Sequence, residues 1–130
     1  MNASRNRRLS AIVGAFLLLV AGGTAFLWEG VFEAPVLLGQ VTMLGLAGCC
    51  DIVAATDTRL TDRWPWYRWS GLGNVLLGVA LPLGAVGSDD TLVFAVVAGV
   101  GGLSLVAMGI DMLVFHGAYT RGQRLDRPDS

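Results

Sequence analysis

The sequence contains no lysine and few charged residues of any kind. Only 15% of its 130 residues are charged, whereas 54% are hydrophobic. A soluble domain of this length would carry about a quarter charged residues. The charges stand in short clusters that separate long apolar runs. This pattern excludes an ordinary soluble domain and predicts a single membrane domain over residues 1–130.

The absence of lysine also bears on the source of the chain. Arginine supplies all nine cationic residues besides the single histidine, and aspartate supplies eight of the ten acids. Such usage is typical of a GC-rich prokaryotic genome. We therefore expect a protein of a prokaryotic plasma membrane, in contact with membrane lipids, and no nucleic-acid partner.

Motifs for catalysis or cofactor binding are missing as well. The chain has no HExxH, no GxSxG, no phosphate-binding loop and no set of Cys and His at metal-ligand spacing. The adjacent Cys49 and Cys50 lie within an apolar run, where small buried side chains are expected. The lone His116 is expected to be a passive residue at the membrane surface. We predict that the protein is not an enzyme and holds no cofactor or metal.

Four apolar segments approach the roughly 20 residues that a helix needs to cross a bilayer. Pro82 lies near the end of the third, which is also the shortest. Arginines precede the first segment, as they precede the apolar region of a signal peptide. The apolar run is longer than the hydrophobic region of an ordinary signal peptide, so we expect this segment to be retained in the protein. The sequence predicts an all-α membrane protein, a bundle of four transmembrane helices at about 9–28, 35–55, 70–86 and 92–115.

The arginines predict the orientation of these spans. Cytoplasmic connections are rich in Arg and Lys, and the two connections with Glu29, Glu33, Asp89 and Asp90 have no basic residue. Both termini are therefore expected in the cytoplasm, and insertion in both orientations is excluded. The nine arginines fall in three groups on the predicted cytoplasmic side: Arg5, Arg7 and Arg8; Arg59, Arg63 and Arg68; Arg121, Arg124 and Arg127.

The two halves of the chain align when one is shifted by 60 residues. Arg8 then meets Arg68, and Asp51 meets Asp111, without any gap. This alignment predicts two helical hairpins related as parallel repeats. A chance match between two hairpins of similar composition is the alternative.

Two acids lie inside the predicted spans, where an ionisable group is costly. Asp51 and Asp111 each stand four residues before the inner end of a span, and a helix C-terminus disfavours an anion. We therefore expect both to have partners on the inner side. Along the same helix faces, Gln40 and Ser104 add polarity. The predicted intramembrane polar cluster comprises Asp51, Asp111, Asn74, Arg8, Arg68, Gln40 and Ser104.

Aromatic residues crowd into the connection before the third span. Amphipathic rings prefer the depth of the lipid headgroups, and nearby arginine attracts anionic lipid. The cluster predicts an interfacial anchor; a dedicated surface for lipid or a partner is the alternative. It consists of Trp64, Trp66, Tyr67 and Trp69.

Two functions fit these features. Fourteen of the eighteen glycines lie in the spans, and small residues let membrane helices pack closely. This favours a non-catalytic membrane subunit or scaffold that packs with itself, as a homo-oligomer, or with a larger membrane complex. The alternative is a small transporter or channel coupled to protons or cations, with Asp51 and Asp111 as the titrating groups. The shallow position of both acids counts against the alternative, because transporter sites usually lie near the midplane.

Overall fold

The computed structural model describes residues 3–86, 89, 91–122 and 124–127. This part of the chain is all-helical and contains no strand. Its five helices are α1 (Ala3–Leu27), α2 (Pro35–Ala55), α3 (Arg59–Arg63), α4 (Trp66–Leu83) and α5 (Leu92–Val114).

Among the described residues, three helices are long and apolar enough to cross a membrane: Ser4–Leu27 of α1, α2 and α5. The prediction of an all-α membrane protein is confirmed at this level, but the count of four spans is not. The remaining long helix, α4, has only 18 residues and includes Arg68 and Asn74 in its first half. These two polar residues lower its mean hydropathy.

Prolines lie at three of the helix boundaries. Pro35 occupies the first turn of α2, where its missing N–H costs no hydrogen bond, and α2 has the predicted bounds. The third predicted span differs more, since α4 begins four residues earlier, directly after Pro65, and ends at Leu83. Pro82 lies in the last turn of α4, and proline cannot support continuation of the helix.

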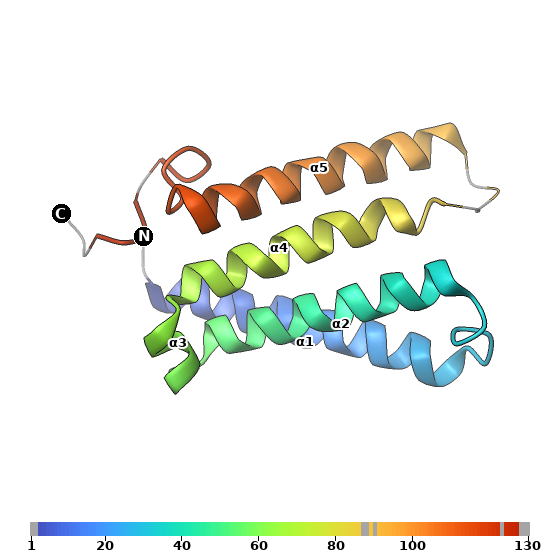
Figure 1. Cartoon of the computed structure of the whole chain (residues 1–130), viewed down its shortest axis with the longest axis horizontal. Coiled ribbons are helices and arrows are strands. Elements are labelled where there is room, and N and C mark those ends of the chain that lie inside the picture. Colours follow the sequence, from blue (N-terminus) through green and yellow to red (C-terminus); the bar gives the residue numbers. More distant parts are fainter. Residues whose placement is uncertain (1–2, 87–88, 90, 123, 128–130) are drawn as a thin grey trace.

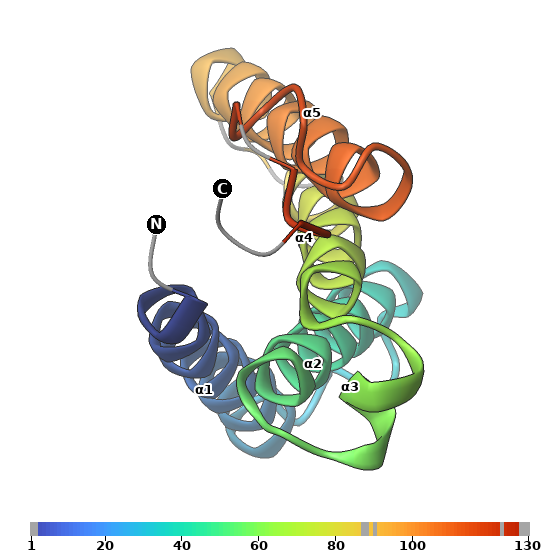
Figure 2. The ribbon, with the colours of Figure 1, turned by 90° about the vertical axis from the view of Figure 1, so that its left-hand side faces the viewer.

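The four long helices form an open, curved row in the order α1, α2, α4, α5. Each packs against its neighbour in this order, and α1 and α5 stand at the two edges of the row with an open side between them (Figure 2). The arrangement is more open than a four-helix bundle, in which the first and last helices would also pack together. We call the side of the row between α1 and α5 the concave side.

Glycines let the helix backbones of each hairpin approach closely. A Cβ atom added at Gly78 of α4 would lie only 2.5 Å from the carbonyl oxygen of Gly102 of α5. No larger residue fits there without displacing backbone, which is the usual function of glycine in membrane helix packing. The close pairs are Gly14 with Gly48, Gly71 with Gly109, and Gly78 with Gly102.

One end of the molecule carries the beginning of α1, the short α3 and the chain that follows α5 (Figure 1). The connections between α1 and α2 and between α4 and α5 lie at the opposite end. The three segments that carry the nine arginines are therefore at one end of the helix row. We call it the arginine-rich end.

Candidate functional site

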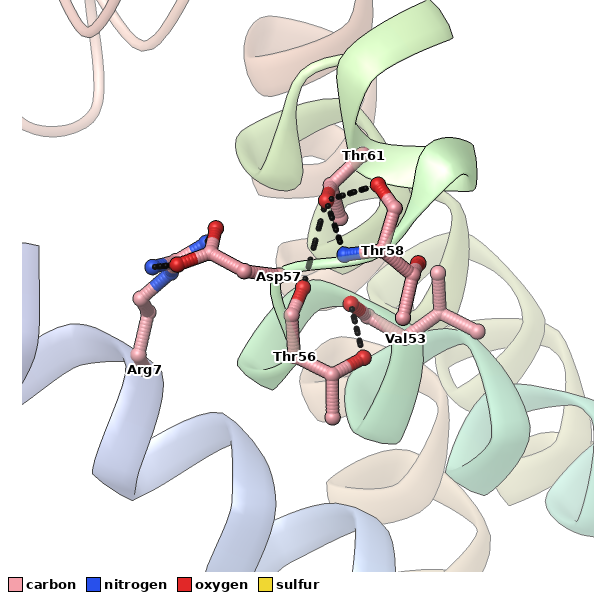
Figure 3. Close-up of polar contacts among 6 residues, drawn as sticks. All are labelled: Arg7, Val53, Thr56, Asp57, Thr58 and Thr61. Atoms are coloured by element: carbon pink, nitrogen blue, oxygen red, sulfur yellow. Dashed lines mark hydrogen bonds and ion pairs between the residues drawn. The ribbon is translucent and has the colours of Figure 1, made fainter.

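An ion pair joins α1 to the connection between α2 and α3. Arg7 Nη1 donates to Asp57 Oδ2 at 3.0 Å, and Arg7 Nη2 bonds the other carboxylate oxygen (Figure 3). The Arg7 guanidinium lowers the pKa of the Asp57 carboxyl below its ordinary value, chiefly through this hydrogen bond. The pair is exposed, so its net contribution to stability is small. Arg7 was predicted only as one of the cytoplasmic arginines, and Asp57 was not predicted to have a role.

Threonine side chains shape the turn that follows (Figure 3). The backbone N–H of Thr58 donates to Thr61 Oγ1 at 3.0 Å, and the Thr61 hydroxyl lies 2.8 Å from the Thr58 carbonyl. The first of these bonds belongs to a capping box at the beginning of α3, in which the Thr58 side chain in turn accepts from the Thr61 backbone N–H. The box satisfies backbone donors that the helix leaves free. The turn directs the chain from the end of α2 into α4.

The four aromatic residues predicted as an interfacial anchor have different surroundings. Trp64 and Trp69 meet edge to face at 5.2 Å, and Trp69 Nε1 donates to the Leu60 carbonyl at 3.3 Å, so both fasten α3 onto α4. Tyr67 is buried and meets the ring of His116 at 5.7 Å. Trp66 lines a cavity described below.

Asp111 anchors the chain that follows α5. Its carboxylate accepts hydrogen bonds from the Thr120 backbone N–H at 2.8 Å, the Thr120 hydroxyl at 2.5 Å and the Tyr119 N–H at 3.3 Å. The chain can fold back because His116 and Gly117 have left-handed φ values of 57° and 79°. Asp111 is only 4% exposed. The unfavourable position of this acid at a helix C-terminus is thus offset by donors from the following turn.

Asp51 lies between two glycines of neighbouring helices. A Cβ atom added at Gly14 of α1 would lie 3.0 Å from the Asp51 Cβ, and one added at Gly73 of α4 would lie 3.2 Å from Asp51 Oδ1. The side chain of Ser70 hydrogen-bonds the carboxylate. Asp51 is 5% exposed. The two glycines therefore make room for a buried acid at the centre of the row.

A cavity of about 160 Å³ adjoins Asp51 on the concave side. All four long helices contribute to its wall, and so does Arg121 from the chain after α5. Burial lowers the pKa of the Arg121 guanidinium, and the charge of Asp111 acts in the opposite direction. The cavity, which we call the Asp51 cavity, is lined by Asn6, Leu9, Ser10, Val13, Asp51, Trp66, Ser70, Asn74, Met108 and Arg121.

The structure brings together only part of the predicted polar cluster. Asp51 and Asn74 share the Asp51 cavity, and Asn74 Nδ2 also lies 3.7 Å from the Met112 sulfur. Within the described residues, no ion pair joins Asp51 or Asp111 to an arginine. The arginine that lines the Asp51 cavity is instead Arg121, which lies ten residues beyond Asp111 along the chain.

The two arginines predicted to open the odd-numbered spans lie elsewhere. Arg8 is exposed. It lies near the beginning of α1, which stands at one edge of the row. Arg68 Nη2 lies 3.5 Å from His116 Nε2, and its Nε is buried without a hydrogen-bond partner. Arg68 lies in the first turn of α4, and its side chain is directed to His116, which follows the end of α5.

Gln40 and Ser104 lie away from the Asp51 cavity. Gln40 lines a separate cavity of about 200 Å³ with Leu83 and Gly84, at the opposite end of the row. Ser104 is exposed and donates to the Val100 carbonyl of its own helix at 2.8 Å. Neither residue was distinguishable by sequence from those that line the cavity, because helix periodicity does not reveal which face is covered.

Among the described residues, no group of three or more His, Cys, Asp or Glu side chains could hold a metal ion. No curated protein matches the chain, and no solved structure matches it. A family model described as "Family of unknown function (DUF7994)" matches residues 5–124. This match covers nearly the whole chain, and the protein therefore belongs to the DUF7994 family.

Proposed function

We propose that this protein is a non-catalytic integral membrane subunit with four spans, which associates with further copies of itself. The fourth span is α4. It packs between α2 and α5, both of which are long and apolar enough to cross a membrane. A helix flanked on both sides by spans shares their layer, and the polar residues of α4 lie mainly in its first half, near the arginine-rich end.

The proposed orientation places both termini in the cytoplasm. It is supported by the arrangement of the arginines, since the three segments that carry them lie at one end of the row (Figure 1). The acidic connection with Glu29 and Glu33 lies at the other end. Cytoplasmic ends of membrane helices are the arginine-rich ones.

The glycine contacts support a repeat of two hairpins. In the first hairpin the close pair is at positions 14 and 48. When this pair of positions is shifted by 60 residues, it falls at positions 74 and 108. These positions lie between the two close pairs of the second hairpin, which are 71 with 109 and 78 with 102. The two hairpins therefore cross at corresponding levels, although different positions supply the glycines.

The observation that carries self-association is the open concave side of α5. Gly101 and Ser104 share a helix face with Met108, which lines the Asp51 cavity. No atom lies within 4 Å of the position of a Cβ at Gly101, and Ser104 is exposed. Small residues without a protein neighbour offer another helix a close approach, which is how membrane helices associate.

Substitution of Gly101 tests this proposal. Gly101→Leu fills the small face, and we expect it to shift the purified protein from oligomer to monomer in mild detergent, measured by native mass spectrometry and by crosslinking in membranes. Gly99→Leu is the matched control, because Gly99 also has no neighbour within 4 Å but points to the other side of α5. A wild-type protein that is monomeric in both measurements contradicts the proposal.

The Asp51 cavity favours a second candidate, a small transporter or channel for protons or cations. A buried acid beside a polar cavity could bind such an ion within the membrane. A liposome flux assay distinguishes the candidates, with wild type, Asp51→Asn and Asp111→Asn compared across several cations and pH values. Flux that either substitution abolishes, while the variant stays folded, favours transport over the subunit.

A further inference from the structure

The Asp51 cavity contains one acidic and one basic side chain that do not pair with each other. Asp51 enters from α2 and Arg121 from the chain after α5. Within the described residues, no ion pair involves either of them. Two opposite charges held apart in one small cavity are electrostatically complementary to a molecule that carries both charges in the reverse order.

The other polar groups extend this complementarity. Ser70, which hydrogen-bonds the Asp51 carboxylate, and Asn74 stand one helical turn apart on α4. Asn6 and Ser10 stand one turn apart on α1, and all four residues line the cavity. Their oxygens can accept hydrogen bonds from an ammonium group. The planar guanidinium of Arg121 is suited to the oxygens of a phosphate. Trp66 adds an aromatic wall, which also attracts cations.

Size and position restrict the ligand further. The cavity measures about 160 Å³, well below the roughly 300–1,000 Å³ of pockets for drug-sized molecules. Its lining residues lie in the first halves of α1 and α4, toward the ends of α2 and α5 and in the chain after α5, so it adjoins the arginine-rich end. The row of helices is open between α1 and α5 on the concave side (Figure 2). The position of the cavity in the membrane rests on the proposed topology. In that topology the Asp51 cavity lies at the depth of the cytoplasmic lipid headgroups, and lipid can enter it from the side.

We propose that the Asp51 cavity binds a phosphoethanolamine group, with its ammonium at Asp51 and its phosphate at Arg121. Two sources share this chemistry: the headgroup of phosphatidylethanolamine and the free zwitterion. An anionic lipid such as phosphatidylglycerol lacks the ammonium that Asp51 requires. Phosphatidylcholine lacks the N–H donors, because its nitrogen is fully methylated.

Native mass spectrometry of the purified full-length protein tests this assignment. Phosphatidylethanolamine, phosphatidylglycerol and phosphatidylcholine with identical acyl chains are titrated separately into the wild-type protein. We expect phosphatidylethanolamine to bind at least tenfold more tightly than the other two. Equal binding of the three lipids, or no binding of phosphatidylethanolamine, overturns the proposal, and this comparison requires no variant.

Variants then assign the contacts. Asp51→Asn and Arg121→Gln should each weaken phosphatidylethanolamine binding about tenfold or more. Asp126→Asn and Arg124→Gln are the matched controls, since these residues pair with each other outside the Asp51 cavity, and they should bind as wild type. Selective binding that persists in both cavity variants, with helicity and elution volume unchanged, overturns the assignment of this cavity.

Competition identifies the source of the group. Displacement of the lipid by free phosphoethanolamine, but not by ethanolamine or inorganic phosphate alone, supports the free zwitterion as a ligand. Failure to displace a selectively bound phosphatidylethanolamine supports the lipid. Lipid selectivity is measured separately from oligomeric state and ion flux, so failure here is distinguishable from failure of the proposed function.

Discussion

The carboxylate of Asp111 accepts hydrogen bonds from both the backbone N–H and the hydroxyl of Thr120, at 2.8 and 2.5 Å. The acid belongs to the last turn of α5, whereas its donors belong to the chain that folds back over that turn. Because Arg121 follows Thr120 directly, this contact also holds the arginine that lines the Asp51 cavity.

Asp111→Asn should loosen the turn after α5. The amide retains one acceptor oxygen and loses the charge, so Tyr119 and Thr120 lose hydrogen bonds to a charged acceptor, at a cost of about 1–3 kcal/mol. Hydrogen exchange should accelerate in peptides that cover residues 115–125. Asp126→Asn, a change in an acid of the same tail, should leave exchange in that segment close to wild type; equal effects of the two substitutions would contradict the anchoring function of Asp111.

Alanine at Gly78 and at Gly99 should have effects of opposite sign. A Cβ at Gly78 meets the Gly102 carbonyl oxygen at 2.5 Å and Val106 Cγ2 at 2.8 Å, and such overpacking costs about 1–3 kcal/mol. A Cβ at Gly99 meets no atom within 4 Å, so Gly99→Ala should stabilise α5 by up to about 1 kcal/mol through helix propensity. Unfolding in mixed micelles measures both, and a neutral Gly78→Ala would show that the α4 and α5 backbones are farther apart.

The pair of Arg7 and Asp57 should make stability weakly dependent on acid pH. The pKa of Asp57 is lower in the folded protein than its ordinary value, so the unfolded chain binds a proton first as the pH falls. The stabilisation is therefore complete above the ordinary carboxyl pKa and is lost as the pH falls through the folded value. A double-mutant cycle with Arg7→Gln and Asp57→Asn, repeated at low and high salt, should give a small coupling that salt reduces.

Single cysteines should report the topology. In a variant with Cys49 and Cys50 replaced by Ala, we expect a cysteine at Asp126 to be protected from an impermeant thiol reagent in intact cells. A cysteine at Glu33, in the connection at the opposite end of the row, should react. Reaction at residue 126 with protection at residue 33 would reverse the proposed orientation.

The helices of this fold are predictable from sequence because long apolar runs and prolines determine them locally. The expected segments 35–55 and 92–115 match candidate spans closely, and α2 has the expected bounds. The first candidate span begins at Ser4, five residues before the expected start at residue 9. The predicted start of α4 is four residues too late, because aromatic residues after Pro65 are expected in a loop. Nothing in their backbone prevents a helix. A mixed aromatic and basic segment is compatible with either structure.

The site was predictable only in part, because its geometry depends on how the helices are ordered in the row. Asp51 and Asn74 line the same cavity because α2 packs on α4, whereas the sequence predicted only that both belong to one polar cluster. Arg121 could not be placed, because its position depends on a left-handed turn at His116 and on the bonds of Asp111. Gly117 was the available signal, since glycine often ends a helix in this conformation.

Segments from the beginning of α1 and from the chain after α5 meet at the Asp51 cavity, where Asn6 lines the same space as Arg121. Synthesis proceeds from the N-terminus, and early segments fold before later ones. The first hairpin thus enters the membrane with its part of the cavity wall incomplete, and the wall closes only after Arg121 has been synthesised and the turn after α5 has folded. A ligand that requires both walls would therefore bind only once both hairpins and this turn are in place, which would make its occupancy a marker of completed cavity assembly.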